Sequence, residues 1–217
     1  MIQKEVYFVR HGESESNADG VHRGREALIT EKGIEQAKEV AKRVEKLHID
    51  ALIATSFPRA RVTAEHIRER IGLPIEENDL FAERRSPSVV VGRHVQDSEV
   101  RKTMYEIYEG YKDMNHRHSD EEDFSDLRLR ANRALDFLRQ HEAPRLCVVM
   151  HGLFLRMLFC AAINGADFTG VDLQRAIRGL EMDNTGISYF RLVSKVWLSE
   201  EETYWQVVSW NDSAHLG

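Results

Sequence analysis

Two short apolar segments, far apart in the chain, each end in a histidine followed by a glycine. Residues 6–9 run into Arg10-His11-Gly12, and residues 146–150 run into His151-Gly152. Both segments have the length and the β-branched content of buried strands. In open α/β sheets, ligands bind beyond the carboxyl ends of the strands, and Gly12, without a Cβ, would let a bound group approach the backbone. The pair therefore predicts a two-histidine site at one sheet edge, although either histidine alone is better interpreted as an ordinary strand end.

The chain after the first of these strands alternates between helical and strand patterns. Apolar residues at helical spacing predict a helix over about 31–47, with Thr30 near its N-cap. Residues 50–55 are the next strand candidate. A helix over about 59–70 follows, with Ser56 as the expected cap. This strand–helix order predicts an α/β fold with a mainly parallel sheet.

The second half of the chain continues this order and then departs from it. Helices are predicted around 127–138, over 153–164 and over 172–180. Alternation at 187–193 and 204–208 predicts a pair of edge strands. The expected fold is a three-layer α/β sandwich with helices on both faces of the sheet and C-terminal edge strands.

The alternation breaks between about residues 84 and 125. Val100, Met104 and Ile107 recur at helical spacing inside this segment. Unstructured loops of this length are uncommon, so we expect a small inserted helical cap within one domain spanning 1–217. His116 and His118 near acidic residues 120–123 offer zinc-type ligands, but a solvated charged loop is the favoured interpretation because no ligand spacing is enforced.

Composition limits the partners and the compartment. The net charge of −6 argues against general nucleic-acid binding, and the longest apolar run, 153–163 with Arg156 inside it, is too short for a bilayer. The chain enters a strand almost at once, with no visible signal peptide. Cys147 and Cys160 lie in apolar segments and are interpreted as buried free thiols in a reducing compartment. We expect a cytoplasmic protein; the oligomeric state is not indicated.

Five residues gather at the predicted sheet edge. They are Arg10, His11, Arg59, Glu83 and His151. Arginine forks bind phosphate oxygens bidentately and keep their charge. A neutral imidazole is a nucleophile near pH 7, and a nearby carboxyl group can protonate a leaving oxygen. These are the groups needed to take a phosphoryl group from an alcohol, where catalysis consists mostly of positioning and charge stabilisation.

The chain resembles the histidine phosphatase superfamily, the phosphoglycerate-mutase-like proteins. The resemblance runs in order along nearly the whole chain and is carried by Arg10-His11-Gly12-Glu13, Asn17, residues 28–37 (LITEKGIEQA), Arg59-Ala60, Thr63-Ala64, Glu83, His151-Gly152 and Asn184-Thr185. It implies a mainly parallel sheet flanked by helices, a covalent phosphohistidine mechanism, and neither cofactor nor metal.

The resemblance also implies a role for each matching residue. His11 would be phosphorylated, Glu83 would be the proton donor, and His151 would be the second histidine. The residues that would bind phosphate or substrate are Arg10, Asn17, Gly24, Arg59, His151 and Gly152. Gly24 lies where the substrate loop of the family runs.

The implied activity is hydrolysis of a small phosphorylated substrate, with water as the acceptor in the second step. Mutase-type transfer to a sugar acid is the competing interpretation, but the family's mutases carry a tyrosine and a basic residue at set positions after the glutamate, where this chain has Arg84-Arg85-Ser86-Pro87-Ser88. The same residues would also suit a non-catalytic phosphate-binding module and, more weakly, a zinc hydrolase. Arg84, Arg85, Arg93 and His94 are equally consistent with substrate recognition and with a solvated basic loop.

Overall fold

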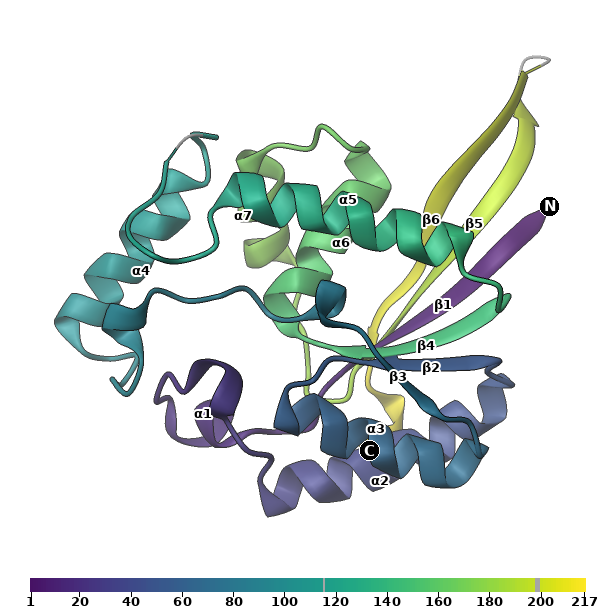
Figure 1. Ribbon diagram of the computed structural model, residues 1–217, viewed down its shortest axis with the longest axis horizontal. Helices are drawn as coiled ribbons and strands as arrows, with labels where there is room; N and C mark the ends of the chain where they lie inside the picture. The colour runs from purple at the N-terminus through teal and green to yellow at the C-terminus, as the bar shows by residue number, and fades with distance from the viewer. Residues whose placement is uncertain (115, 198–199) are drawn as a thin grey trace.

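A six-stranded mixed sheet forms the centre of the molecule (Figure 1). The computed structural model describes residues 1–114, 116–197 and 200–217. The strand order is β3-β2-β4-β1-β5-β6. The strands are β1 (Ile2–Arg10), β2 (Ala51–Ala54), β3 (Ile75–Glu77), β4 (Arg145–Met150), β5 (Ile187–Trp197) and β6 (Glu200–Asp212). The pairings from β3 to β1 are parallel, and those of β5 with β1 and β6 are antiparallel.

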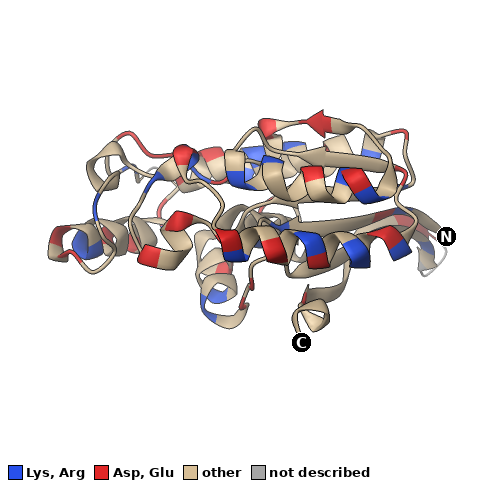
Figure 2. Cartoon of the chain, turned by 90° about the horizontal axis from the view of Figure 1, so that it is seen from below, with Lys and Arg blue, Asp and Glu red and all other residues tan. Residues whose placement is uncertain are grey.

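Helices cover both faces of the sheet, as the predicted three-layer architecture requires. The helices of the described residues are α1 (Glu15–Asp19), α2 (Glu31–Val44), α3 (Pro58–Ile71), α4 (Ser98–Gly110), α5 (Phe124–Gln140), α6 (Gly152–Asn164) and α7 (Gly170–Gly179). Short 3-10 turns lie at Gly24–Glu26, Glu45–Leu47, Asp79–Phe81, Ser88–Val90 and Ala214–Leu216. Figure 1 shows α2 and α3 on one face and α5 and α6 on the other. Basic and acidic residues are interspersed along the helices (Figure 2).

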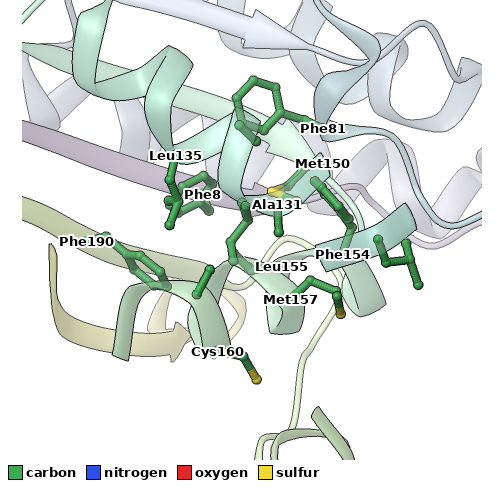
Figure 3. Close-up of a cluster of buried hydrophobic side chains, with 14 of the residues drawn as sticks. Phe8, Phe81, Ala131, Leu135, Met150, Phe154, Leu155, Met157, Cys160 and Phe190 are labelled. Atoms are coloured by element: carbon green, nitrogen blue, oxygen red, sulfur yellow. The ribbon is translucent and has the colours of Figure 1, made fainter. Parts of the chain in front are cut away.

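The two faces of the sheet bury separate cores, because successive residues of a strand point to opposite faces. Phe8 and Val148 belong to the core under α5 and α6, which Figure 3 shows around Phe81, Phe154 and Leu155. The neighbouring residues Val9 and Val149 belong to the core against α2 and α3. The sequences of the central strands are therefore continuous apolar runs, and this is the pattern from which the strands were predicted.

The C-terminal strands were predicted as a pair of edge strands, and only β6 is one. β5 pairs with β1 on one side and with β6 on the other, so it is an interior strand. Its pairing with β1 follows from the buried side chains of Phe190 and Leu192, which extend the core under α6. Both strands project from the body of the molecule in Figure 1.

The helix starts follow local capping chemistry, with one correction. The Thr30 hydroxyl accepts a hydrogen bond from the Gly33 N–H at 3.0 Å, as expected of an N-cap. The predicted cap Ser56 is wrong for α3, whose N-cap is Phe57 with Pro58 at the first helical position. Ser56 is instead held by Asp79, whose carboxylate accepts from both its N–H and its hydroxyl at 2.8 Å.

The segment between Glu83 and α5 contains one turn of 3-10 helix and α4. Helix α4 packs against α7, where the Gln174 amide donates to the Tyr108 carbonyl at 2.6 Å. Gly170 permits this contact, since a Cβ there would lie 1.7 Å from the Tyr111 carbonyl oxygen. In the charged loop, the His118 ring pairs with Glu106 at 3.1 Å.

Three further observations concern the cysteines, the length and hydropathy of the helices, and groups of metal-ligand side chains. Cys147 and Cys160 are buried free thiols, as predicted. No helix in the described ranges combines the length and the hydropathy needed to span a membrane. Within those same ranges, no three or more His, Cys, Asp or Glu side chains are grouped so that they could hold a metal ion.

Candidate active site

A cavity of about 360 Å³ lies at the carboxyl ends of the central strands. Its walls include Arg10, His11, Asn17, Gly24, Arg59, Glu83 and Gly152. The register explains why the two histidines meet. Arg10 of β1 pairs with Met150 of β4, so His11 and His151 follow at adjacent strand ends, with ring centroids 5.1 Å apart. The topology thus brings these side chains, predicted from sequence, to one place.

The imidazole of His11, which lines the cavity, has a hydrogen-bond partner at each of its two nitrogens. Its Nδ1 lies 2.7 Å from the Gly12 carbonyl oxygen, which can only accept, so Nδ1 carries the proton. Its Nε2 then bears the lone pair and accepts from Arg59 Nε at 3.2 Å. Burial, followed by the charges of Arg59 and Arg10, holds the pKa of His11 well below its usual value. A neutral, correctly oriented imidazole results.

Arg10 and Arg59 supply the positive charge of the cavity. Burial lowers the pKa of Arg59 to about 10, so Arg59 is charged at neutral pH, and burial also lowers the pKa of Arg10. The Arg59 guanidinium donates to the carbonyl oxygens of Gly24 at 3.0 Å and Arg25 at 3.3 Å. Arg10 donates to the Met182 carbonyl, and its Nε is buried with no partner among the described residues. A bound oxyanion would satisfy that N–H.

His151 lies behind the cavity rather than in its wall. It is the N-cap residue of α6 and is fully buried. Its Nε2 lies 2.8 Å from the Thr55 hydroxyl, and its Nδ1 has no partner in the described part of the chain. Burial, followed by the charges of His11 and the nearby arginines, holds its pKa well below the usual value. Gly152, directly after it, does line the cavity.

Glu83 reaches the cavity from the loop after β3 and binds the start of α6. Its carboxylate oxygens accept from the N–H groups of Leu153 at 3.0 Å and Phe154 at 3.1 Å. These N–H groups have no acceptor within the helix, and the helix N-terminus carries partial positive charge. One oxygen also accepts from the Arg84 N–H at 2.9 Å. Glu83 therefore faces the cavity in a fixed position.

Asn17 and Gly24 complete the wall formed by the loop after β1. The Asn17 carbonyl oxygen accepts from the Ser14 hydroxyl at 3.0 Å and the Asn184 amide at 3.1 Å. These contacts leave the Asn17 NH₂ as the group available to a ligand. Gly24, with φ of 55°, offers its carbonyl to Arg59.

Gly12 has a different function from the one its position suggested. A missing Cβ was expected to let a bound group approach the backbone. The atom that approaches is instead the Gly33 carbonyl oxygen, which a Cβ at Gly12 would meet at 2.4 Å. Gly12 thus makes room for the first turn of α2, and its N–H donates to the Thr63 hydroxyl at 3.0 Å.

Sequence reasoning missed Arg156 and the hydroxyl of Thr55. Arg156 lines the cavity and donates to the carbonyls of Gly152 at 3.1 Å and Leu180 at 2.6 Å. The sequence does contain a signal for Arg156, because it is the one charged residue in a predicted apolar helix and lies four residues after Gly152. The sequence did not decide whether the basic residues after Glu83 recognise substrate or form a solvated loop. Of these residues, Arg84 lines the cavity, whereas Arg93 pairs with Asp97 at 2.7 Å.

Comparison with known proteins places the chain in one family. The model of the histidine phosphatase superfamily (branch 1) matches residues 6–213. A probable phosphoglycerate mutase, GpmB, of Enterobacter sp. (strain 638) is 30% identical over 219 residues, which cover 98% of this chain and 94% of that protein.

Solved structures with the same fold have lower sequence identity. A mutant phosphoserine phosphatase from Entamoeba histolytica, in complex with phosphoserine, has a TM-score of 0.76 at 21% identity over 98% of this chain and 99% of that one. A putative alpha-ribazole-5'-P phosphatase from Escherichia coli K-12 has a TM-score of 0.77 at 19% identity, covering 96% of each chain.

Proposed function

The chain belongs to the histidine phosphatase superfamily, and on that premise we propose that it hydrolyses phosphomonoesters through a phosphohistidine at His11. One observation carries the proposal. The Nδ1–H of His11 is bound to the Gly12 carbonyl, while Nε2 lies 3.2 Å from the Arg59 guanidinium. A neutral imidazole of fixed tautomer beside a cation is suited to attack a phosphorus whose oxygens that cation holds.

In the first step, Nε2 of His11 attacks phosphorus and the bond to the alcohol oxygen breaks. Arg10 and Arg59 hold the non-bridging oxygens, and Glu83 gives its proton to the leaving oxygen. In the second step, water attacks the phosphohistidine and transfers a proton to Glu83. The phosphorus–nitrogen bond breaks, phosphate leaves, and His11 is restored.

Mutase-type transfer is the second candidate. It is supported by the names of the curated relatives, which are probable phosphoglycerate mutases at 29–30% identity. The same covalent intermediate would serve, with a sugar-acid hydroxyl in place of water. A non-catalytic binding module is disfavoured because His11, Glu83 and both arginines line one cavity. The buried thiols of Cys147 and Cys160 support a cytoplasmic enzyme.

A trapping experiment tests the proposal. The protein is mixed with ³²P-labelled phenyl phosphate or 3-phosphoglycerate and quenched within one turnover, and released phosphate and isomerised product are measured in parallel. We expect acid-labile, base-stable label on His11, absent in His11→Ala, together with release of phosphate. Label that is stable to acid and labile to base would indicate a carboxylate nucleophile. Faster isomerisation than phosphate release would support the mutase.

A further inference from the structure

A second cavity, of about 790 Å³, adjoins the phosphate cavity. The two share six wall residues, which are Arg23, Gly24, Phe57, Glu83, Arg84 and Ser86. They therefore meet around the carboxylate of Glu83. Together they have the size of a site for a molecule larger than a phosphate ion.

The walls beyond the shared residues present apolar side chains to the open space. These side chains are Leu80, Ala82, Val91 and Leu129. Leu129 is 52% exposed on α5 and Val91 is 49% exposed. Neither side chain belongs to the two buried cores of the described residues, so packing within those cores does not explain why these positions are apolar.

Two arginines of this cavity are already bound to other groups of the protein. Arg130 donates to Glu122 at 2.7 Å and stacks over the Phe154 ring at 3.7 Å. Arg85 donates to the Asp120 carbonyl at 2.8 Å. These two guanidinium groups are therefore satisfied within the protein, whereas the apolar side chains of Val91 and Leu129 remain exposed in the wall.

We propose that this cavity, named here the leaving-group cavity, binds an apolar body on the alcohol of the substrate. The inference rests on the proposed function. If Glu83 protonates the leaving oxygen, the alcohol must extend from phosphorus toward Glu83, where the leaving-group cavity begins. A three-carbon acid would fit in the smaller cavity and leave the larger one unfilled. The substrate class is therefore a phosphomonoester of an extended, largely apolar alcohol.

A series of primary alkyl phosphates tests this assignment without changing the chemistry of the leaving oxygen. Ethyl, butyl and hexyl phosphate have leaving alcohols of nearly equal basicity and differ in apolar length. Each methylene buried by the cavity should raise kcat/KM about fourfold, which is on the order of 10²-fold from ethyl to hexyl. If all three alkyl phosphates are hydrolysed with the same kcat/KM, the assignment is overturned and the proposed function remains intact.

Matched variants locate the effect. Leu129 lines the leaving-group cavity, whereas Ile163 does not. Both residues are on helices and both are 52% exposed, so Leu129→Gln and Ile163→Gln form a matched pair. Leu129→Gln should lower kcat/KM for hexyl phosphate roughly tenfold and leave ethyl phosphate unchanged. Ile163→Gln should change neither substrate.

The outcomes separate the two proposals. Equal effects of the two variants on hexyl phosphate would place the apolar contact elsewhere and overturn the assignment. If no alkyl phosphate is hydrolysed and no phosphohistidine is trapped, the proposed function itself fails, and the assignment of a leaving group fails with it.

Discussion

The hydroxyl oxygen of Thr55 lies 2.8 Å from Nε2 of His151, and both side chains are fully buried. Thr55 directly follows β2, whereas His151 is the N-cap residue of α6. The hydrogen bond fixes the imidazole through one nitrogen. It leaves Nδ1 buried without a partner among the described residues, directly behind the cavity that His11 lines.

Replacing Thr55 by valine should therefore slow turnover without unfolding the protein. Valine has nearly the same shape, so the buried site stays filled while the hydrogen bond is lost. We expect kcat to fall up to about 10²-fold through misplacement of His151, with KM little changed. Thr55→Ser keeps the hydroxyl and should restore most of the rate. Equal loss in both variants would contradict a positioning role for the hydroxyl.

Glu83→Gln should separate proton donation from helix capping. If Glu83 is the general acid, the variant should lose roughly 10²–10⁴-fold on ethyl phosphate. It should lose much less on 4-nitrophenyl phosphate, because nitrophenolate leaves without a proton. If the carboxylate only binds the N–H groups of Leu153 and Phe154, both substrates should slow by one common factor. Urea unfolding measures the capping loss, which we expect to be about 1–3 kcal/mol.

Arg59→Lys should slow phosphoryl transfer even though it keeps the charge. Lysine lacks the planar fork, so it cannot hold a phosphoryl oxygen and the carbonyls of Gly24 and Arg25 together. We expect a loss on the order of 10²–10³-fold in kcat/KM. Arg61→Lys is the control, because Arg61 is on the same helix but pairs with Glu77 at the surface. Comparable losses in the two variants would remove Arg59 from the site.

Unfolding free energy should fall as the pH drops below about 6.5. The pKa of His151 is lowered in the folded state, so the unfolded chain binds the proton more readily, and stability rises with pH in this window. The same holds for His11, whose pKa is also lowered. Each group contributes up to about 1.4 kcal/mol per pH unit below its unfolded pKa.

Urea titrations at several pH values between 7.5 and 5.0 measure this slope. His151→Gln should reduce the slope by about 1 kcal/mol per pH unit. His94→Gln, a substitution of an exposed histidine outside the cavity, is the control. An unchanged slope in His151→Gln would show that burial does not keep this imidazole neutral.

The sheet and the meeting of the strand ends could be predicted because both depend on local patterns. Residues 6–9 and 146–150 carry the short apolar runs that are typical of strands covered on both faces, and the strand ends then bring His11 and His151 together. The α3 cap could not be predicted in the same way. Ser56 has the chemistry of a cap, but Asp79, 23 residues later, binds it instead.

The details of the site depend on contacts that sequence spacing does not encode. Thr55 and His151 are 96 residues apart, and Glu83 meets the α6 N-terminus 70 residues further along the chain. Gly12 was expected to let a ligand approach the backbone. The sequence shows only that the residue is a glycine, and it does not show whether a ligand or a backbone carbonyl fills the space of the missing Cβ. Only the packing of α2 distinguishes these two cases.

The bond from Arg10 to the Met182 carbonyl also sets when the candidate active site can be completed during synthesis of the chain. The two residues are 172 positions apart, and Arg10 N–H further donates to the Gly186 carbonyl at 3.2 Å. At about 5–20 residues per second, a ribosome needs roughly 10–35 s to make the intervening chain. During that interval Arg10 lacks this support, so a nascent chain that stops short of β5 carries the proposed nucleophile, His11, without a finished cavity.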